Sequence, residues 1–473
     1  DGLLPIRKDL RSVAVIGPAA DTVSYGDYTE TRGRKGGVSV LDGIRAAVSP
    51  ETEVLYERGC NFLGQALHPF DPSMLRDENG ESGLTGHYYN GPVPQGEPVQ
   101  VRTDRTVNFN WIFALPHPAL DANGFSVVWT GSVVMPRTMD GCIGLSTQDS
   151  MRLYVDDKLL IDGWGKDKSA DQALDFHFEA GRAYKIRIEF VNDRRGARVI
   201  FGYSAGRENF PAAVEAARKA DVAILCMGDN EETSGENFDR TDLNLPGRQL
   251  ELVQAVYATG TPVVLVLQSG RPVTANWEND HLPAILEAWF PGEQGGTAIA
   301  KTLFGDAAPG GRLPITFPRS VGQIPCHYSR RPGGGKRYVE MDWLPLYPFG
   351  YGLTYTTFAY RDMALSRSVI DPQDTVTVSV TVTNTGKYTG DAVPQLYVRD
   401  MFSSVVKPER QLAAFRRLTL APGESRRVEL TVGPKQLRTL GPDYVWRVEP
   451  GKFELQLGDN AENILLRADL TVE

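Results

Sequence analysis

FPAAVEAARKADVAILCMG, residues 210–228, joins a stretch of helical spacing to an unbroken apolar run. The next residues repeat this order, because GRQLELVQAVYATG (247–260) has helical spacing and PVVLVLQSG (262–270) is again apolar. A short run with almost no polar residue is typical of a strand that is covered on both faces. Helices that alternate with such strands favour parallel pairing. The stretch therefore predicts an α/β domain with a parallel sheet.

The same pattern occurs near the N-terminus and then stops. VAVIGP (13–18) and EVLYERG (53–59) are predicted strands, and VSVLDGIRAAV (38–48) is the predicted helix between them. Beyond residue 270 the pattern continues with PAILEAWF (283–290) and EQGGTAIAKTLFG (293–305). We therefore expect an α/β domain in two parts, residues 1–81 and 205–326.

Residues 82–204 have a different texture, with alternating apolar and polar residues between turn signals. FSVVWTGSVVM (125–135) and YKIRIEFVN (184–192) are examples, and LYVDDKLLID (153–162) predicts a hairpin that turns at Asp156-Asp157. Several short strands of this kind favour a β-sandwich. Loop tips tolerate inserted domains, so we expect an all-β insert within the α/β domain.

The C-terminal third is also predicted to be a β-sandwich. Residues 327–358 show no sustained period and are expected to form a connection. From 359 to 473 alternation returns, as in TVTVSVTVTNTG (375–386) and GKFELQLGD (451–459), which favours a fibronectin type III-like sandwich. The expected fold is thus an α/β sandwich, interrupted by an all-β sandwich and followed by a second one.

Composition narrows the classes of partner. The chain has 473 residues, more than one hydrophobic core usually serves, and a net charge of −9, which disfavours nucleic acid. It contains no apolar run of the ~20 residues that a membrane-spanning helix needs. The four cysteines and six histidines are scattered, so we expect no disulfide framework, metal site or other cofactor, and Cys226 is expected to be a core thiol.

A polar stretch after the apolar run 222–228 is the main candidate for chemistry. ETSGENFDRTDLNLPG (232–247) leaves the sheet at the carboxyl end of a predicted parallel strand, where loops converge on ligands. Glu236 is the candidate catalytic carboxyl, and Glu231 and Glu232 are alternatives. Asp239 and Arg240 would support the loop, with an ion pair between them as the plainer interpretation.

Two aromatic residues of the insert are weaker candidates. Trp111 and Phe113 have rings that can stack on a sugar, and the alternative is that both belong to the sandwich core.

In order along the chain, several motifs resemble the C-terminal half of glycoside hydrolase family 3 β-glucosidases and β-xylosidases. They include LLPIRKDLRSVAVIGPAAD at the start, SGENFDRTDLNLPGRQLELVQAV, AILEAWFPGEQGGTAIAKTLFGDAAPGGRLPITFP and PLYPFGYGLTYTTFAY. The insert is similar to a protective-antigen-like sugar-binding sandwich, and the tail resembles the fibronectin type III-like domain of the family. The resemblance covers nearly the whole chain.

The resemblance implies a retaining β-glycosidase in which Glu236 is the general acid/base. The family's usual Glu-Gly-x-Asp-Arg corresponds to Glu236–Arg240, with Asn237 in place of the glycine. This replacement bears on the backbone conformation of the loop, because glycine adopts a positive φ freely. Asparagine tolerates a positive φ better than most other residues. The aspartate nucleophile of the family lies on a (β/α)₈ barrel. We expect that barrel to be absent from these residues and to be supplied by another segment or chain, without which the chain would be inactive.

The sequence leaves several alternatives open. The implied substrate is a terminal β-D-glucosyl residue of a short oligosaccharide or glycoside, with a β-xyloside as the alternative. A non-catalytic carbohydrate-binding or scaffold subunit is a competing class, and the resemblance fits an N-acetylglucosaminidase less well, since those relatives take their acid/base from the barrel. Homo-oligomers are compatible with the family. Its members are more often secreted or periplasmic than cytoplasmic, and the sequence leaves the compartment undecided.

Overall fold

The computed structural model divides the chain into two compact units. It describes residues 2–473 except 27, 30–35, 63–66, 112–114, 122–123, 148, 166–171, 193–196, 205–209, 232 and 334–337. One unit consists of Asp1–Arg58 and Pro211–Glu473, and the other of Gly59–Phe210. The second unit contains the all-β insert and is wider than the range 82–204 that alternation in the sequence suggested.

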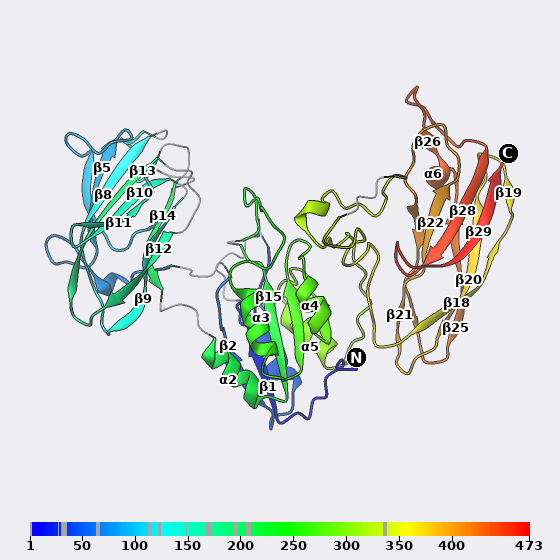
Figure 1. Ribbon diagram of the computed structural model, residues 1–473, viewed down its shortest axis with the longest axis horizontal. Helices are drawn as coiled ribbons and strands as arrows, with labels where there is room; N and C mark the ends of the chain where they lie inside the picture. Colours follow the sequence, from blue (N-terminus) through cyan, green and yellow to red (C-terminus); the bar gives the residue numbers. More distant parts are fainter. Residues whose placement is uncertain are drawn as a thin grey trace. The chain divides into compact units, whose positions relative to one another are not determined.

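A five-stranded parallel sheet forms the α/β part of the first unit (Figure 1). The strand order is β17-β16-β15-β1-β2, and every neighbouring pair is parallel. Strands β1, β15 and β16 are buried along their whole length, which explains why their sequences lack alternation. The fold class predicted from the apolar runs is confirmed. The five strands are β1 (Ser12–Ile16), β2 (Glu53–Glu57), β15 (Val222–Gly228), β16 (Val263–Gln268) and β17 (Ala284–Glu287).

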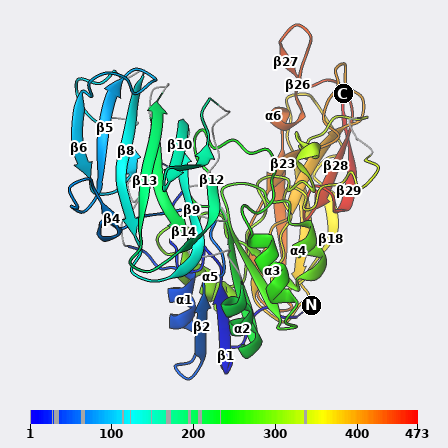
Figure 2. The same cartoon turned by 60° about the vertical axis from the view of Figure 1, so that its left-hand side comes forward.

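Helices cover both faces of this sheet. Helix α1 (Val40–Ala47) packs against α5 (Gly295–Leu303), and α2 (Pro211–Lys219) packs against α3 (Gln249–Tyr257). Figure 2 shows the two pairs on opposite sides of the sheet. A Cβ atom at Gly43 of α1 would collide with the Gly296 carbonyl of α5, so the two glycines permit the close contact. A short helix, α4 (Asn276–His281), precedes β17.

The second unit is a sandwich of two antiparallel sheets. One sheet has the order β11-β10-β13-β8-β5-β6, with β4 also on β8, and the other has the order β12-β9-β14-β3, with β7 also on β14. Asp156 and Asp157 join β10 to β11 with φ values of 49° and 62°, the left-handed pair that a two-residue hairpin needs, so the predicted turn is confirmed. The elements are β3 (His68–Pro69), η1 (Pro72–Met74), β4 (Leu75–Arg76), β5 (Leu84–Asn90), β6 (Gln100–Asp104), β7 (Asn108–Asn110), β8 (Phe125–Val134), β9 (Met139–Thr147), β10 (Ser150–Val155), β11 (Lys158–Asp162), β12 (Gln172–Phe178), β13 (Ala183–Asn192) and β14 (Arg198–Ser204).

The C-terminal part of the first unit is the predicted β-sandwich. Its sheets have the orders β18-β20-β25 and β19-β29-β28-β22-β23. Along β20 every second residue is buried, because one face of the strand meets an aliphatic core that includes Val378, Val380 and Leu455. The elements are η2 (Val321–Gln323) in the connection, then β18 (Phe358–Leu365), β19 (Val369–Ile370), β20 (Val376–Asn384), β21 (Gly390–Ala392), β22 (Gln395–Asp400), β23 (Gln411–Phe415), β24 (Leu418–Leu420), β25 (Ser425–Val432), α6 (Pro434–Leu437), β26 (Thr439–Leu440), β27 (Trp446–Arg447), β28 (Gly451–Gly458) and β29 (Ile464–Val472).

Three further structural findings concern membranes, metals and thiols. Among the described residues, no helix is long and apolar enough to cross a membrane, and no group of three or more metal-binding side chains occurs. None of the four cysteines, all of which are described, forms a disulfide bond. Cys226 is fully buried in β15, as expected of a core thiol, and burial raises its pKa.

Candidate functional site

The loop that carries Glu236 begins where β15 leaves the sheet. Gly228 ends the strand with a φ of 140°, and a Cβ atom there would collide with the carbonyl of Gln268 on β16. The side-chain amide of Gln249, at the start of α3, accepts from the Gly228 N–H at 2.7 Å and donates to the Gly228 carbonyl at 2.8 Å. This brace fixes the end of β15 against the helix that follows the loop. Residues 229–244 between them are called the site loop below.

Glu236 lies at the exposed part of the site loop. The backbone turns there, since the Phe238 N–H donates to the Gly235 carbonyl at 3.2 Å. Asn237 has a φ of 65°, the left-handed conformation that a glycine adopts without strain and that asparagine adopts more readily than most residues. Glu236, Asn237 and Asp239 are all exposed. The turn therefore places Glu236 on the surface of the first unit.

An ion pair between fully buried Asp229 and largely buried Arg271 lies at the start of the site loop. Asp229, the first residue after β15, is 0% exposed, and one of its carboxylate oxygens is 3.0 Å from Nε of Arg271. The hydroxyl of Thr233 donates to the other carboxylate oxygen at 3.0 Å and accepts from the Asn230 N–H at 3.0 Å. Burial lowers the pKa of Arg271, and the Asp229 carboxylate opposes that shift. The first turn of the site loop is thus ordered around a buried charge.

Strand β17, which pairs with β16, ends in a half-buried acid, Glu287. Oε2 of Glu287 is buried, and Oε1 accepts from the Trp289 N–H at 2.9 Å. Burial raises the pKa of Glu287 to about 8, against the lowering effect of that hydrogen bond, and the charge of Asp229 adds to the rise. Asp229, Arg271 and Glu287, each just past or at the carboxyl end of one of three adjacent strands, are called the loop floor below.

The predicted loop residues have different surroundings. Within the described residues the ion pair of Arg240 is with Asp242, at 3.7 Å, and not with Asp239 as the plainer interpretation expected. Arg240 also donates to the Asp242 carbonyl at 3.3 Å, so it braces the distal part of the site loop. Glu231 is half-buried beside the first turn, and Glu232 lies outside the described residues.

The two predicted sugar-stacking residues belong to the insert. Trp111 is 9% exposed and lies in the sandwich core. Its ring stacks on those of Phe109 and Trp129, with centroid-to-centroid distances of 4.7 Å and 6.4 Å. This packing favours the core alternative, because it leaves little of the indole face for a ligand. Phe113 lies outside the described residues.

Sequence reasoning missed the loop floor. Arg271 and Glu287 stand where apolar runs end, in VVLVLQSGR and AILE, and Asp229 follows VAILCMG in the same way. A charged residue at the carboxyl end of each of three adjacent parallel strands was the signal that could have identified them.

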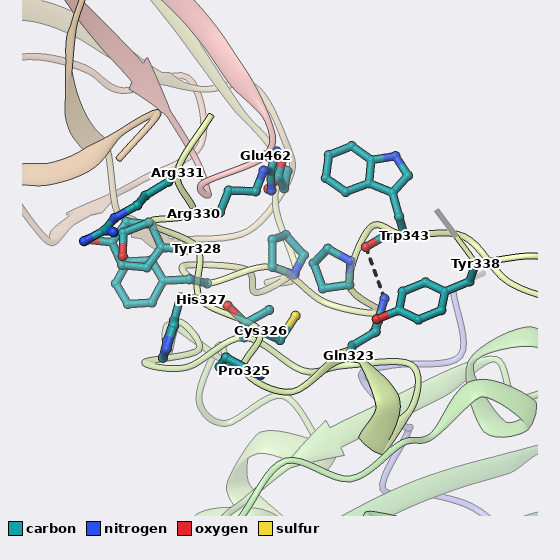
Figure 3. Close-up of a pocket in the computed structure, with 15 residues that line it drawn as sticks. Gln323, Pro325, Cys326, His327, Tyr328, Arg330, Arg331, Tyr338, Trp343 and Glu462 are labelled. Carbon is teal, nitrogen blue, oxygen red and sulfur yellow. Dashed lines mark hydrogen bonds and ion pairs between the residues drawn. The ribbon is translucent and has the colours of Figure 1, made fainter. Parts of the chain in front are cut away.

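A pocket of about 430 Å³ lies elsewhere in the first unit, in the connection before β18 (Figure 3). Trp343, Tyr338 and three prolines contribute to its walls, and Gln323 donates to the Trp343 carbonyl at 3.1 Å. Its Arg330 is already paired with Glu462 at 2.6 Å and Glu409 at 3.2 Å. Neither Glu236 nor the loop floor lines this pocket.

Comparison with known proteins gives two family matches. Residues 1–355 match the profile described as "Glycosyl hydrolase family 3 C-terminal domain", and residues 392–461 match that of a "Fibronectin type III-like domain". A "Beta-glucosidase" of Rhizobium radiobacter is 34% identical over 508 aligned residues, which cover 100% of this chain and 60% of the relative. A "Beta-xylosidase" of Formosa agariphila is 45% identical over 302 residues, covering 61% of this chain and 42% of the relative.

Solved structures give the same picture. A crystal structure of a β-glucosidase from Kluyveromyces marxianus, in complex with glucose, matches with a TM-score of 0.72 and 27% identity. The match covers 100% of this chain and 60% of that one. The chain therefore spans about 60% of the length of the relatives that it matches from end to end.

Proposed function

This chain belongs to glycoside hydrolase family 3, and from that premise we propose that it supplies the general acid/base of a retaining β-glycosidase. Glu236 is the proposed acid/base. The nucleophile is a carboxylate on a (β/α)₈ barrel that these 473 residues do not include. A β-glucoside is the favoured substrate, because a relative that matches along the whole chain is named a β-glucosidase.

The observation that carries this proposal is the presentation of Glu236. An exposed carboxylate sits on a left-handed turn, in a loop that a buried ion pair and a side-chain amide hold against the carboxyl edge of a parallel sheet. Loops at this edge face ligands in open α/β sheets. A rigid mount matters because a general acid must meet the glycosidic oxygen within hydrogen-bond distance.

In the proposed reaction the barrel carboxylate attacks the anomeric carbon and the bond to the leaving oxygen breaks. Protonated Glu236 gives its proton to that oxygen, so the leaving group departs as a neutral alcohol. The same carboxylate, now ionised, takes a proton from water as the water attacks the glycosyl-enzyme. Retaining enzymes of this kind hold the two carboxyl groups about 5 to 5.5 Å apart.

The experiment that tests this function compares the chain alone with the protein that includes its barrel. We expect no hydrolysis of a chromogenic β-glucoside by the chain alone, and hydrolysis once the barrel is present. In the barrel-containing protein, Glu236→Ala should remove most activity, and azide should restore release of the phenol by attacking the glycosyl-enzyme without base assistance. Activity that survives Glu236→Ala without azide would assign the acid/base elsewhere.

A β-xylosidase is the second candidate, since the β-xylosidase relative shares 45% of its aligned residues with this chain. The ratio of kcat/KM for 4-nitrophenyl β-xyloside and β-glucoside decides between them. A ratio above one would replace glucose by xylose as the preferred sugar. If neither glycoside is cleaved but sugars still bind, the protein is a carbohydrate-binding subunit instead.

A further inference from the structure

Arg271 connects the two ends of the site loop. It is the third residue after the end of β16, and its side chain is 13% exposed. On one side it reaches Asp229, where the loop begins, through Nε at 3.0 Å and Nη2 at 3.2 Å. On the other it reaches the end of the loop, where Nη1 donates to the Leu243 carbonyl and Nη2 to the Asn244 carbonyl, each at 2.9 Å.

The segment that carries Arg271 is itself fixed to the same loop end. The Thr274 N–H donates to the Leu243 carbonyl at 3.0 Å, and the Thr274 hydroxyl donates to Oδ1 of Asn244 at 2.6 Å. The Ser269 hydroxyl donates to the Arg271 carbonyl at 2.8 Å. Residues 269–274, between β16 and α4, are therefore hydrogen-bonded to the end of the site loop.

A guanidinium suits this position for a geometric reason. It is planar, always charged, and presents five N–H donors in a fixed fork, so one group can meet a carboxylate and two carbonyls at once. A lysine ammonium would keep the charge next to Asp229 but, as a compact point charge, would not span both loop ends. Because the Arg271 guanidinium contacts both the first and the last residues of the site loop, it restricts the positions that Glu236 can adopt.

We propose that Arg271 is a positioning residue for the acid/base, tying both ends of the site loop so that the Glu236 carboxyl meets the leaving-group oxygen. The inference rests on the proposed function. Arg271 touches no reacting atom in this role. Its effect on the rate comes through the placement of the Glu236 carboxyl alone.

The test uses the dependence of the rate on the leaving group. Departure of 2,4-dinitrophenolate needs little help from an acid, whereas a plain phenol or a sugar must be protonated as it leaves. In the barrel-containing protein, Arg271→Lys should lower kcat/KM about 100-fold for phenyl β-glucoside and less than about 3-fold for the 2,4-dinitrophenyl compound. Glu236→Gln should show the same pattern more strongly, and serves as the reference.

Arg330→Lys is the matched control. Arg330 is also a partly buried guanidinium, 21% exposed, and its ion pairs in the described part of the chain are with Glu409 and Glu462, which lie outside the site loop. Arg330→Lys should change kcat/KM by the same factor for phenyl and 2,4-dinitrophenyl β-glucoside, or leave both values unchanged. If Arg271→Lys unfolds the protein, Thr274→Val, which removes only the hydroxyl that holds Asn244, should show a smaller version of the same pattern.

The outcomes separate the two proposals. An equal loss on both substrates in the Arg271 and Thr274 variants, with the pattern intact in Glu236→Gln, would overturn the positioning role and leave the acid/base assignment standing. No leaving-group dependence in Glu236→Gln would overturn both.

Discussion

Glu236 and Asp229 are carboxylates of one loop, seven residues apart, with opposite surroundings. Glu236 is exposed on a turn, whereas Asp229 is fully buried and paired with Arg271. Removing a buried partner leaves an uncompensated charge, while an exposed carboxylate contributes little to folding. The contrast indicates that buried groups hold the backbone of the loop, whereas the carboxylate of our proposed acid/base lies on its exposed turn.

The first and largest expected effect is a loss of activity with no change in the stability of the fold. In the barrel-containing protein, Glu236→Gln should lower kcat/KM for phenyl β-glucoside by about 10²- to 10⁴-fold, the usual contribution of general acid catalysis. The midpoint of urea unfolding should stay the same, because the side chain is exposed. A large fall in that midpoint would mean that Glu236 supports the fold, and the contrast with Asp229 would disappear.

The second effect is a loss of stability on substitution of a buried residue of the loop floor. Asp229→Asn should lower the free energy of unfolding of the first unit by about 3 kcal/mol, because Arg271 would remain buried without its carboxylate. Asp239→Asn, an exposed position of the same loop, is the control and should change it by less than about 0.5 kcal/mol. Urea denaturation followed by tryptophan fluorescence measures both. Equal free energies of unfolding for the two variants would contradict the inference that the loop floor stabilises the fold more than the exposed turn does.

The third effect is a pH dependence from Glu287. Folding raises the pKa of this acid from 4.5 to about 8, so the folded protein keeps a proton that the unfolded chain releases. The stability from this group is complete below about pH 4.5 and is lost as the pH rises through about 8. Glu287→Gln cannot release a proton, so the variant should gain stability relative to the parent between about pH 5 and pH 8.5. Parallel stability curves for the two proteins over that range would show that Glu287 is not protonated in the fold.

The smallest effect concerns the backbone at Asn237. With a φ of 65°, Asn237→Gly should keep activity within about 2-fold, since glycine adopts this conformation freely. Asn237→Val should cost about 1 to 2 kcal/mol of loop strain and lower kcat/KM by more than the glycine variant does. Rates on phenyl β-glucoside compare the two. A valine variant as active as the parent would show that the left-handed turn is not required to place Glu236.

Much of this organisation could be predicted from local sequence. Unbroken apolar runs such as 222–228 predicted buried parallel strands, and Asp156-Asp157 predicted the hairpin turn, because both depend on a few neighbouring residues. Glu236 was identified by its place after a strand and by its motif, and its role stays a proposal. The start of the insert was harder to place, because β3 and β4 pair with strands far along the chain, β14 and β8.

The sequence by itself determined the family, the fold class and the loop in which a catalytic carboxyl was sought, since all three are recorded in patterns of adjacent residues. Only the tertiary structure decided that Arg271 meets Asp229, 42 positions earlier, that one carboxylate oxygen of Glu287 is buried, and that Trp111 packs into a core. Parallel strands bring their carboxyl ends together only after the crossover helices have packed. Which charged residues become partners is therefore a property of the folded sheet, in which burial makes an unpaired charge costly.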